Sequence, residues 1–155
     1  TCPDMAYIDR PQPLNGLAGK FSWQYAVSSS LLDGKVDMST FEDDRRFAAD
    51  MEATLKKVNL NMTDTIKGDF LATYVDLEVV MENGSRYQTR CDGPRGSWNG
   101  GSVSLEEHLI KVRSCLSTRL NERDSDRIIE LANSFESLHN KDLQELLSIA
   151  STPKS

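Results

Sequence analysis

Two cations and a phenol near the start of the chain have the chemistry to handle a carboxylic acid. They are Arg10, Lys20 and Tyr7. Arginine can hold a carboxylate with both prongs of its guanidinium fork, whereas lysine acts as a point charge. Either cation could equally bond Asp9 or the carboxyl end of a helix. By its position alone, Tyr7 would end a strand with its ring in the core. The alternative is that Tyr7, Arg10 and Lys20 belong to a binding or catalytic site.

The elements around these candidates are expected to be the end of a strand and a long helix. Met5–Ile8 should finish the strand, because the two prolines that follow cannot donate ladder hydrogen bonds. From Leu17 the apolar spacing becomes helical and continues to a stop at Gly34. Nearly the whole circumference of this helix is apolar or small, which is typical of a buried helix.

A second helix is expected to begin at the capping box Ser39-x-x-Glu42 and to run to about Val58. Its apolar stripe repeats at helical spacing and consists of Phe47, Met51, Leu55 and Val58. The charged residues fall mainly on the other side, which should face solvent, and they are Asp43, Asp44, Arg45, Arg46, Lys56 and Lys57.

Residues 75–91 alternate between apolar and polar side chains and predict a β-hairpin. A two-residue turn would place polar side chains of the second strand on the apolar face. A three-residue turn with Gly84 in the left-handed conformation instead pairs Val79 with Tyr87. We predict the three-residue turn, which also brings Glu78 close to the arginines of the second strand.

After the hairpin comes a glycine-rich segment, and then the chain becomes helical only. The segment lacks the glycine spacing of a nucleotide-binding loop, so it is either a connector or a mobile loop that carries Trp98 toward a substrate or an interface. Ser104 should open the first helix with a capping box, Asp124 or Ser125 could cap the second, and Asn140 could start the third. Each helix has an apolar stripe, and the small sheet cannot cover all three.

The pattern as a whole predicts an α+β fold. We expect a small antiparallel sheet with packed helices in residues 1–102, followed by three carboxy-terminal helices in residues 103–155. A chain of 155 residues with 38% hydrophobic content can build one modest core. The apolar stripes of the last helices should drive association, so an oligomer or a complex is expected.

Composition excludes several classes of partner and site. A formal net charge of −6 disfavours a nucleic-acid partner, and the longest apolar runs fall far below the roughly 20 residues that span a membrane. The three cysteines, which are Cys2, Cys91 and Cys115, lack metal-ligand spacing and are expected to be free thiols in an intracellular protein, either cytoplasmic or mitochondrial. His108 and His139 should be ordinary surface residues. We expect no metal site.

Three short motifs in fixed order resemble the carboxy-terminal part of the MmgE/PrpD family. They are Tyr7-Ile8-Asp9-Arg10-Pro11, Lys20-Phe21-Ser22 with Gln24-Tyr25, and Leu31-Leu32-Asp33-Gly34. The resemblance continues through the hairpin turn to the final leucine-rich helices. The family includes 2-methylcitrate dehydratases, cis-aconitate decarboxylases and iminodisuccinate epimerases. Its members are considerably longer than this chain and have a larger helical domain.

The resemblance implies an activity and a partner. Family reactions move a proton at a carbon next to a carboxylate of a di- or tricarboxylic acid, and no cofactor is implied. Tyr7 would donate a proton or hydrogen bond as the catalytic residue, while Arg10 and Lys20 would bind substrate carboxylates. The chain would be a lid domain, residues 1–102, plus a segment that packs on a separate helical catalytic domain or subunit, and it would be inactive alone. The alternative is a non-catalytic binding or regulatory module that docks on a helical partner or homologue.

Overall fold

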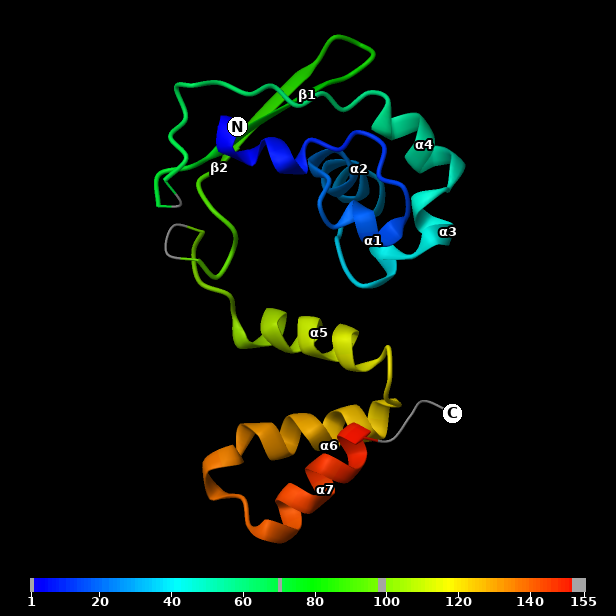
Figure 1. Cartoon of the computed structure of the whole chain (residues 1–155), viewed down its shortest axis with the longest axis vertical. Helices are drawn as coiled ribbons and strands as arrows, with labels where there is room; N and C mark the ends of the chain where they lie inside the picture. Colours follow the sequence, from blue (N-terminus) through cyan, green and yellow to red (C-terminus); the bar gives the residue numbers. More distant parts are fainter. Residues whose placement is uncertain (1, 70, 98–99, 152–155) are drawn as a thin grey trace. The chain divides into compact units, whose positions relative to one another are not determined.

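The computed structural model describes residues 2–69, 71–97 and 100–151, and the chain divides into two compact units. Unit 1 is Thr1–Val103 and unit 2 is Ser104–Ser155 (Figure 1). The fold is mostly helical, with a two-stranded antiparallel sheet in unit 1 and helices in unit 2, which confirms the expected fold class. Trp98, in the glycine-rich segment, lies outside the described residues.

The described elements follow one another along the chain, and Figure 1 labels the α-helices and strands among them. They are the 3-10 helix η1 (Pro3–Ile8), α1 (Gly16–Gly19), α2 (Trp23–Asp33), the 3-10 helix η2 (Ser39–Phe41), α3 (Asp43–Arg46), α4 (Ala49–Leu55), β1 (Val75–Val80), β2 (Arg86–Cys91), α5 (Leu105–Leu116), α6 (Glu122–Asn133), the 3-10 helix η3 (Phe135–Ser137) and α7 (Asn140–Ser151).

Helix η1 stands where the sequence predicted a strand end at Met5–Ile8, so that prediction is wrong. Pro3 occupies the first turn, where its fixed φ suits a helix and its missing N–H is not needed. The backbone N–H of Asp9 closes the last turn on the carbonyl of Ala6 at 3.1 Å. Tyr7 therefore projects from a helical turn and not from a strand.

The helix expected from Leu17 to Gly34 is interrupted between α1 and α2. Ser22 restarts it, because its hydroxyl oxygen accepts a 3.0 Å hydrogen bond from the N–H of Tyr25 and caps α2. Gly34 ends α2 with a φ of 68°, which confirms the predicted stop.

The buried face of α2 is not aliphatic. Its buried residues are Gln24, Tyr25, Ser28 and Ser29. Leu31, by contrast, is 52% exposed. The expectation of a helix buried on all sides is therefore wrong, because a unit of this size covers only the face of α2 that contacts α4.

The second expected helix is also broken, into η2, α3 and α4. Ser39 does not cap a helix, because its hydroxyl donates to Asp37 at 2.6 Å instead. Arg46, expected in solvent, is buried because its Nε donates a 2.7 Å hydrogen bond to the carbonyl of Pro13. Phe47, expected in the apolar stripe, is 55% exposed. The apolar stripe predicted burial for Phe47 on the assumption of one continuous helix, but α3 ends at this residue.

The core of unit 1 is a small cluster of α2 and α4 residues. Tyr25, Met51 and Leu55 are buried in it, and Phe41 and Ala48 pack against it. The ring of Tyr25 lies tilted against that of Phe41, with 6.2 Å between centroids.

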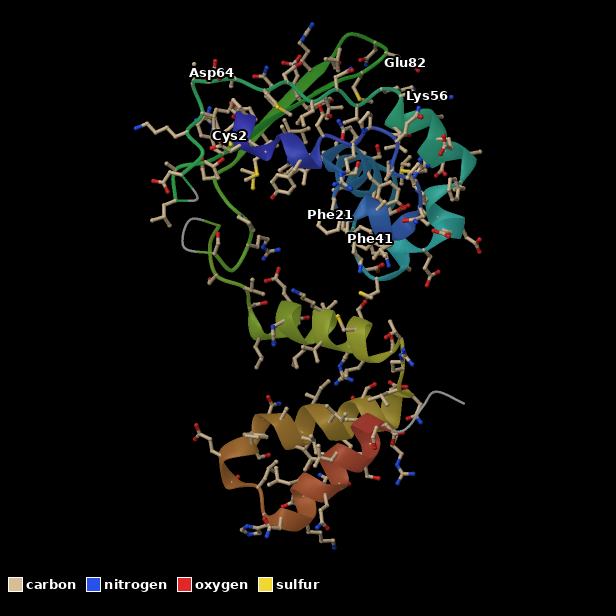
Figure 2. The ribbon with its side chains drawn as sticks, viewed as in Figure 1. Cys2, Phe21, Phe41, Lys56, Asp64 and Glu82 are labelled. Carbon is tan, nitrogen blue, oxygen red and sulfur yellow. The ribbon has the colours of Figure 1, made fainter. Side chains whose placement is uncertain are left out.

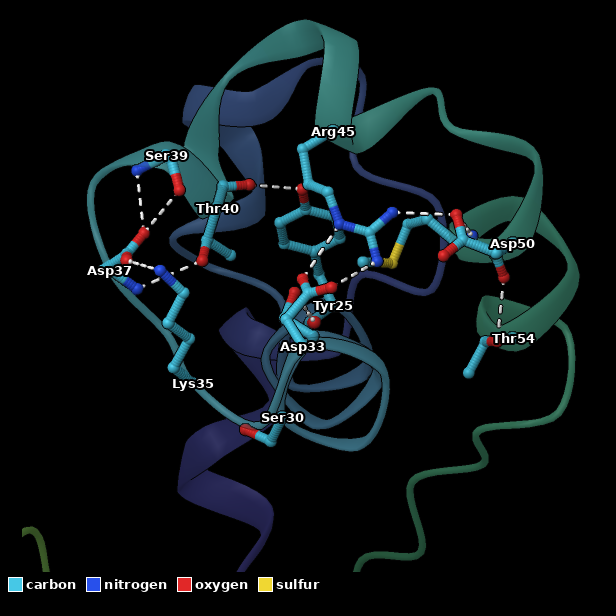
Figure 3. Close-up of polar contacts among 12 residues, drawn as sticks. Tyr25, Ser30, Asp33, Lys35, Asp37, Ser39, Thr40, Arg45, Asp50 and Thr54 are labelled. Carbon is cyan, nitrogen blue, oxygen red and sulfur yellow. Dashed lines mark hydrogen bonds and ion pairs between the residues drawn. The ribbon is translucent and has the colours of Figure 1, made fainter.

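A polar network beside this core joins four elements, which are α2, η2, α3 and α4 (Figure 3). Arg45 of α3 donates through Nε and Nη2 to the two carboxylate oxygens of Asp33 at the end of α2, at 2.9 and 3.0 Å. Its Nη1 donates to Asp50 of α4 at 2.8 Å. The hydroxyl of Tyr25 donates a 2.5 Å hydrogen bond to the carbonyl of Thr40. These bonds fix α2, on which the candidate residues depend, against α3 and α4.

The hairpin has the predicted register and turn. Val79 lies opposite Tyr87, and Gly84 has a φ of 84° in the three-residue turn. Glu78 forms an ion pair with Arg86 on the outer face, as expected. Val75, Leu77 and Val79 of β1 are only half-buried, and Val80 and every residue of β2 are exposed.

Unit 2 begins with the predicted capping box. The hydroxyl oxygen of Ser104 accepts from the N–H of Glu107 at 3.2 Å, and the Glu107 carboxylate accepts from the N–H of Ser104 at 3.0 Å. Helix α6 is capped by Asn121, not by Asp124 or Ser125. The cap lies earlier than predicted because an asparagine side chain satisfies the same orphan N–H groups.

Helices α6 and α7 form the closest pair in unit 2. Arg127 of α6 donates from Nε and Nη2 to both carboxylate oxygens of Glu145 of α7, at 2.9 and 2.8 Å. Leu131 is buried in this unit. On α5, Leu105 and Ile110 remain 68% and 62% exposed, so unit 2 by itself leaves apolar stripes uncovered.

Candidate functional site

Tyr7 lies at the surface of unit 1. Its side chain extends from η1 and is 61% exposed, so its ring is not part of the core. The reading of Tyr7 as a core residue that ends a strand is therefore wrong. An exposed phenol can donate a proton or a hydrogen bond to a molecule that approaches the surface.

Arg10 follows η1 directly and turns back toward Tyr7. Its Nε donates a 3.0 Å hydrogen bond to the backbone carbonyl of Tyr7. Its guanidinium carbon lies 5.6 Å from the centroid of the Phe21 ring, within the range of a cation–π contact. No described residue accepts a hydrogen bond from its Nη1 or Nη2. The structure thus brings Arg10 and Tyr7 together on one turn and leaves one edge of the guanidinium available for an anion.

Gln24 and Ser22, which bond this turn, were not predicted from the sequence to be parts of a candidate site, whereas Asp9 was predicted as a possible bonding partner of the cations. Gln24 accepts from the N–H of Arg10 at 3.2 Å and donates to a carboxylate oxygen of Asp9 at 2.5 Å. Ser22 donates to the carbonyl of Arg10 at 2.6 Å. Asp9 therefore bonds Gln24, and the alternative in which it pairs with Arg10 is not observed. The available signal was the glutamine two residues after a helix cap in an otherwise apolar helix.

Lys20 lies at the end of α1, one residue before the phenylalanine that Arg10 approaches. Its Nζ is 5.4 Å from the centroid of the Phe41 ring. Figure 2 labels Phe21 and Phe41, the two aromatic rings against which the cations lie. No described residue forms an ion pair with Lys20 or Arg10. Neither side chain is therefore paired with a carboxylate among the described residues, so both can bind an anionic ligand.

A pocket that α2 helps to line does not contain the three candidate residues. A pocket of about 190 Å³ lies between α2, residues 58–61 and β1, and Trp23 and Gln24 line it. Tyr7, Arg10 and Lys20 do not line it. The indole N–H of Trp23 is buried without a hydrogen-bond partner among the described residues. None of the three candidates therefore belongs to this pocket, and whereas Tyr7 and Arg10 lie on one turn, Lys20 lies at the end of α1.

Within residues 2–69, 71–97 and 100–151, no group of three or more His, Cys, Asp or Glu side chains is arranged to hold a metal ion. Over the same ranges, none of the helices combines the length and apolar character needed to cross a membrane.

Comparison with known proteins gave matches over most of the chain. The model of the MmgE/PrpD C-terminal domain matches residues 3–137, which span unit 1 and continue through α6 but stop before α7. Cis-aconitate decarboxylase of Mus musculus is 26% identical over 136 residues, which cover 88% of this chain and 28% of that protein. The Homo sapiens protein of the same name gives the same identity and coverage. The chain thus spans about 28% of the length of these curated relatives.

Proposed function

Because this chain belongs to the MmgE/PrpD family, whose C-terminal domain it matches, we propose that it is the lid and carboxy-terminal part of a lyase. The substrate is a citrate- or aconitate-like di- or tricarboxylic acid, and the reaction is a dehydration, decarboxylation or epimerisation. Activity requires a separate helical domain or subunit. Residues 1–102 act as the lid, and residues 103–155 pack on the helical part.

The observation that carries this proposal is the arrangement of Tyr7 and Arg10. A single turn presents an exposed phenol and a cation whose Nη atoms have no described partner. Arg10 binds one substrate carboxylate in a bidentate manner, and Lys20 binds a second carboxylate as a point charge. Tyr7 then donates a proton or hydrogen bond near the reacting carbon.

Two features of unit 1 support the need for a separate helical domain or subunit. Large apolar side chains beside the candidates are exposed, with Leu14 at 87%, Leu17 at 64% and Phe21 at 50%. An acid–base reaction also needs a group that removes or delivers a proton opposite Tyr7. Asp9, the carboxylate closest to the candidates in sequence, is engaged by Gln24. The helical part supplies the missing base and covers the apolar side chains.

The test is to assay the chain alone and after coexpression with the helical domain of a family enzyme. We expect no turnover of cis-aconitate or 2-methylcitrate by the chain alone, and measurable turnover by the copurified complex. Turnover by the isolated chain would contradict the need for a partner. A stable complex that neither turns over nor binds these acids would favour a non-catalytic docking module.

A further inference from the structure

We propose that Gln24 is a positioning residue that, together with Ser22, holds the Arg10 peptide so that the guanidinium faces an incoming carboxylate. This inference rests on the proposed function, because it assigns a role to residues that do not themselves touch the substrate.

The Gln24 side chain is 2% exposed, yet its amide is satisfied at both ends. Its oxygen accepts from the N–H of Arg10, and its NH₂ group donates to the carboxylate of Asp9. A buried amide with two opposite partners has only one favourable orientation, since reversing it would face NH₂ against N–H and oxygen against carboxylate. The N–H of Arg10 is shared between Gln24 at 3.2 Å and the carbonyl of Ile8 at 3.1 Å, so Gln24 adds a link from α2 to a turn that the backbone already closes.

Ser22 fixes the other side of the same residue. Its hydroxyl donates to the carbonyl of Arg10 at 2.6 Å, and its oxygen accepts from the N–H of Tyr25 at 3.0 Å. One hydroxyl thus serves as the cap of α2 and as the anchor of Arg10. Both backbone groups of Arg10 are attached to the first turn of α2.

With its backbone attached in this way, Arg10 can move only at its side chain, and that side chain is restrained as well. Its Nε bonds the Tyr7 carbonyl, and its guanidinium lies against the Phe21 ring. A cation held in place before the ligand arrives loses less conformational entropy on binding. The buried Gln24 and Ser22 therefore set the affinity of Arg10 for a carboxylate without contacting it.

Exchanging the donor and the acceptor of the Gln24–Asp9 hydrogen bond tests the positioning role of Gln24. Gln24→Glu keeps the acceptor for Arg10 but places two carboxylates face to face. The double variant Asp9→Asn/Gln24→Glu restores one donor and one acceptor with their roles exchanged. Gln88→Glu is the matched control, because the amide of Gln88 also donates to a carboxylate, that of Glu78 at 2.6 Å, but on the exposed face of the hairpin.

The experiment is NMR of the full chain, following the Arg10 Nε–H signal and its change on titration with citrate. We expect Gln24→Glu to lose the protected Nε–H signal and to bind citrate about tenfold more weakly, and the double variant to recover both. Gln88→Glu should behave as the wild type. If Gln24→Glu does not fold, Ser22→Gly carries the test, because glycine still caps a helix but cannot donate to the Arg10 carbonyl.

Two results separate the possible failures. If Gln24→Glu and Ser22→Gly fold and leave both the Arg10 signal and citrate affinity unchanged, the positioning role is overturned. If the Arg10 signal responds as expected but the wild-type chain shows no citrate binding alone or with its helical partner, the positioning geometry stands and the proposed carboxylate function fails.

Discussion

Arg46 donates a 2.7 Å hydrogen bond from Nε to the carbonyl of Pro13, and this bond ties the segment that follows Arg10 to α3. The Arg46 side chain is 4% exposed and also forms an ion pair with Glu52 of α4. One buried cation therefore connects the candidate segment with α3 and α4.

The first prediction concerns the stability supplied by this cation. Arg46→Ala removes the donor to the buried Pro13 carbonyl and leaves Glu52 without its partner. The free energy of unfolding should fall by about 2–4 kcal/mol, measured by chemical denaturation. Arg119→Ala, at an exposed position in unit 2, should change it by no more than about 0.5 kcal/mol. A loss as small as that of the control would mean that the Arg46 bonds contribute little.

The second prediction concerns Tyr7 in the active assembly. Tyr7→Phe keeps the ring but removes the hydroxyl, so turnover should drop by roughly 100-fold or more. Since the side chain is 61% exposed, the melting temperature should barely change. Tyr87→Phe, which alters a tyrosine of similar exposure on β2, is the control and should leave the rate intact. An unchanged rate in Tyr7→Phe would remove Tyr7 from the catalytic role.

The third prediction concerns the buried hydroxyl of Tyr25. Tyr25→Phe leaves the carbonyl of Thr40 without its donor, in a buried site. We expect a loss of about 1–3 kcal/mol in the free energy of unfolding, with the fold retained. Thermal unfolding of the two proteins at neutral pH measures the difference, and equal stability would show that the short bond adds no net stability.

The fourth prediction concerns alkaline pH. Burial raises the pKa of Tyr25 above its ordinary value of 10.0, an effect that nearby Arg45 and Arg46 partly oppose. The folded state therefore holds this proton more tightly than the unfolded state. Its contribution to stability is complete below pH 10 and is lost as the pH rises toward the folded pKa. The stability of the wild type should fall more steeply above pH 10 than that of Tyr25→Phe, and parallel pH profiles would contradict this.

The fifth prediction concerns association. Leu14 and Leu17 in unit 1, and Leu105 and Ile110 in unit 2, expose apolar surface that isolated soluble proteins usually cover. The purified chain should therefore sediment as an oligomer or copurify with a helical partner. Replacing Leu105 and Ile110 by serine should shift the sedimentation toward the monomer. A stable wild-type monomer at micromolar concentration would contradict the expectation.

Several predictions that rest on local chemistry succeeded, although the strand end at Met5–Ile8 and the helix cap at Ser39, which are also local, were wrong. Gly34 and Gly84 occupy left-handed conformations that glycine favours, and Ser104 caps α5 through a bond to a residue three positions later. The three-residue turn could be inferred because only one register keeps the apolar residues on one face.

Predictions failed where partners lie far apart along the chain. The residues around Arg46 in the sequence do not indicate that its side chain is buried by a hydrogen bond to the distant carbonyl of Pro13. Gln24 likewise owes its role to partners that precede it by 14 and 15 residues. The candidates Tyr7, Arg10 and Lys20 were named from residue types and from the family resemblance, and their substrate contacts stay a prediction.

The outer face of the hairpin also bears on aggregation. Strand β2 is exposed along its whole length and, within the described sheet, pairs only with β1. An open strand edge is a template on which other chains can add strands and grow fibrils. Arg90, bonded to Asp76 at 2.7 and 2.9 Å, and Arg86, paired with Glu78, stand on this strand. Charged side chains on an edge strand disfavour the addition of another strand, because a chain that docked there would have to dehydrate these ion pairs.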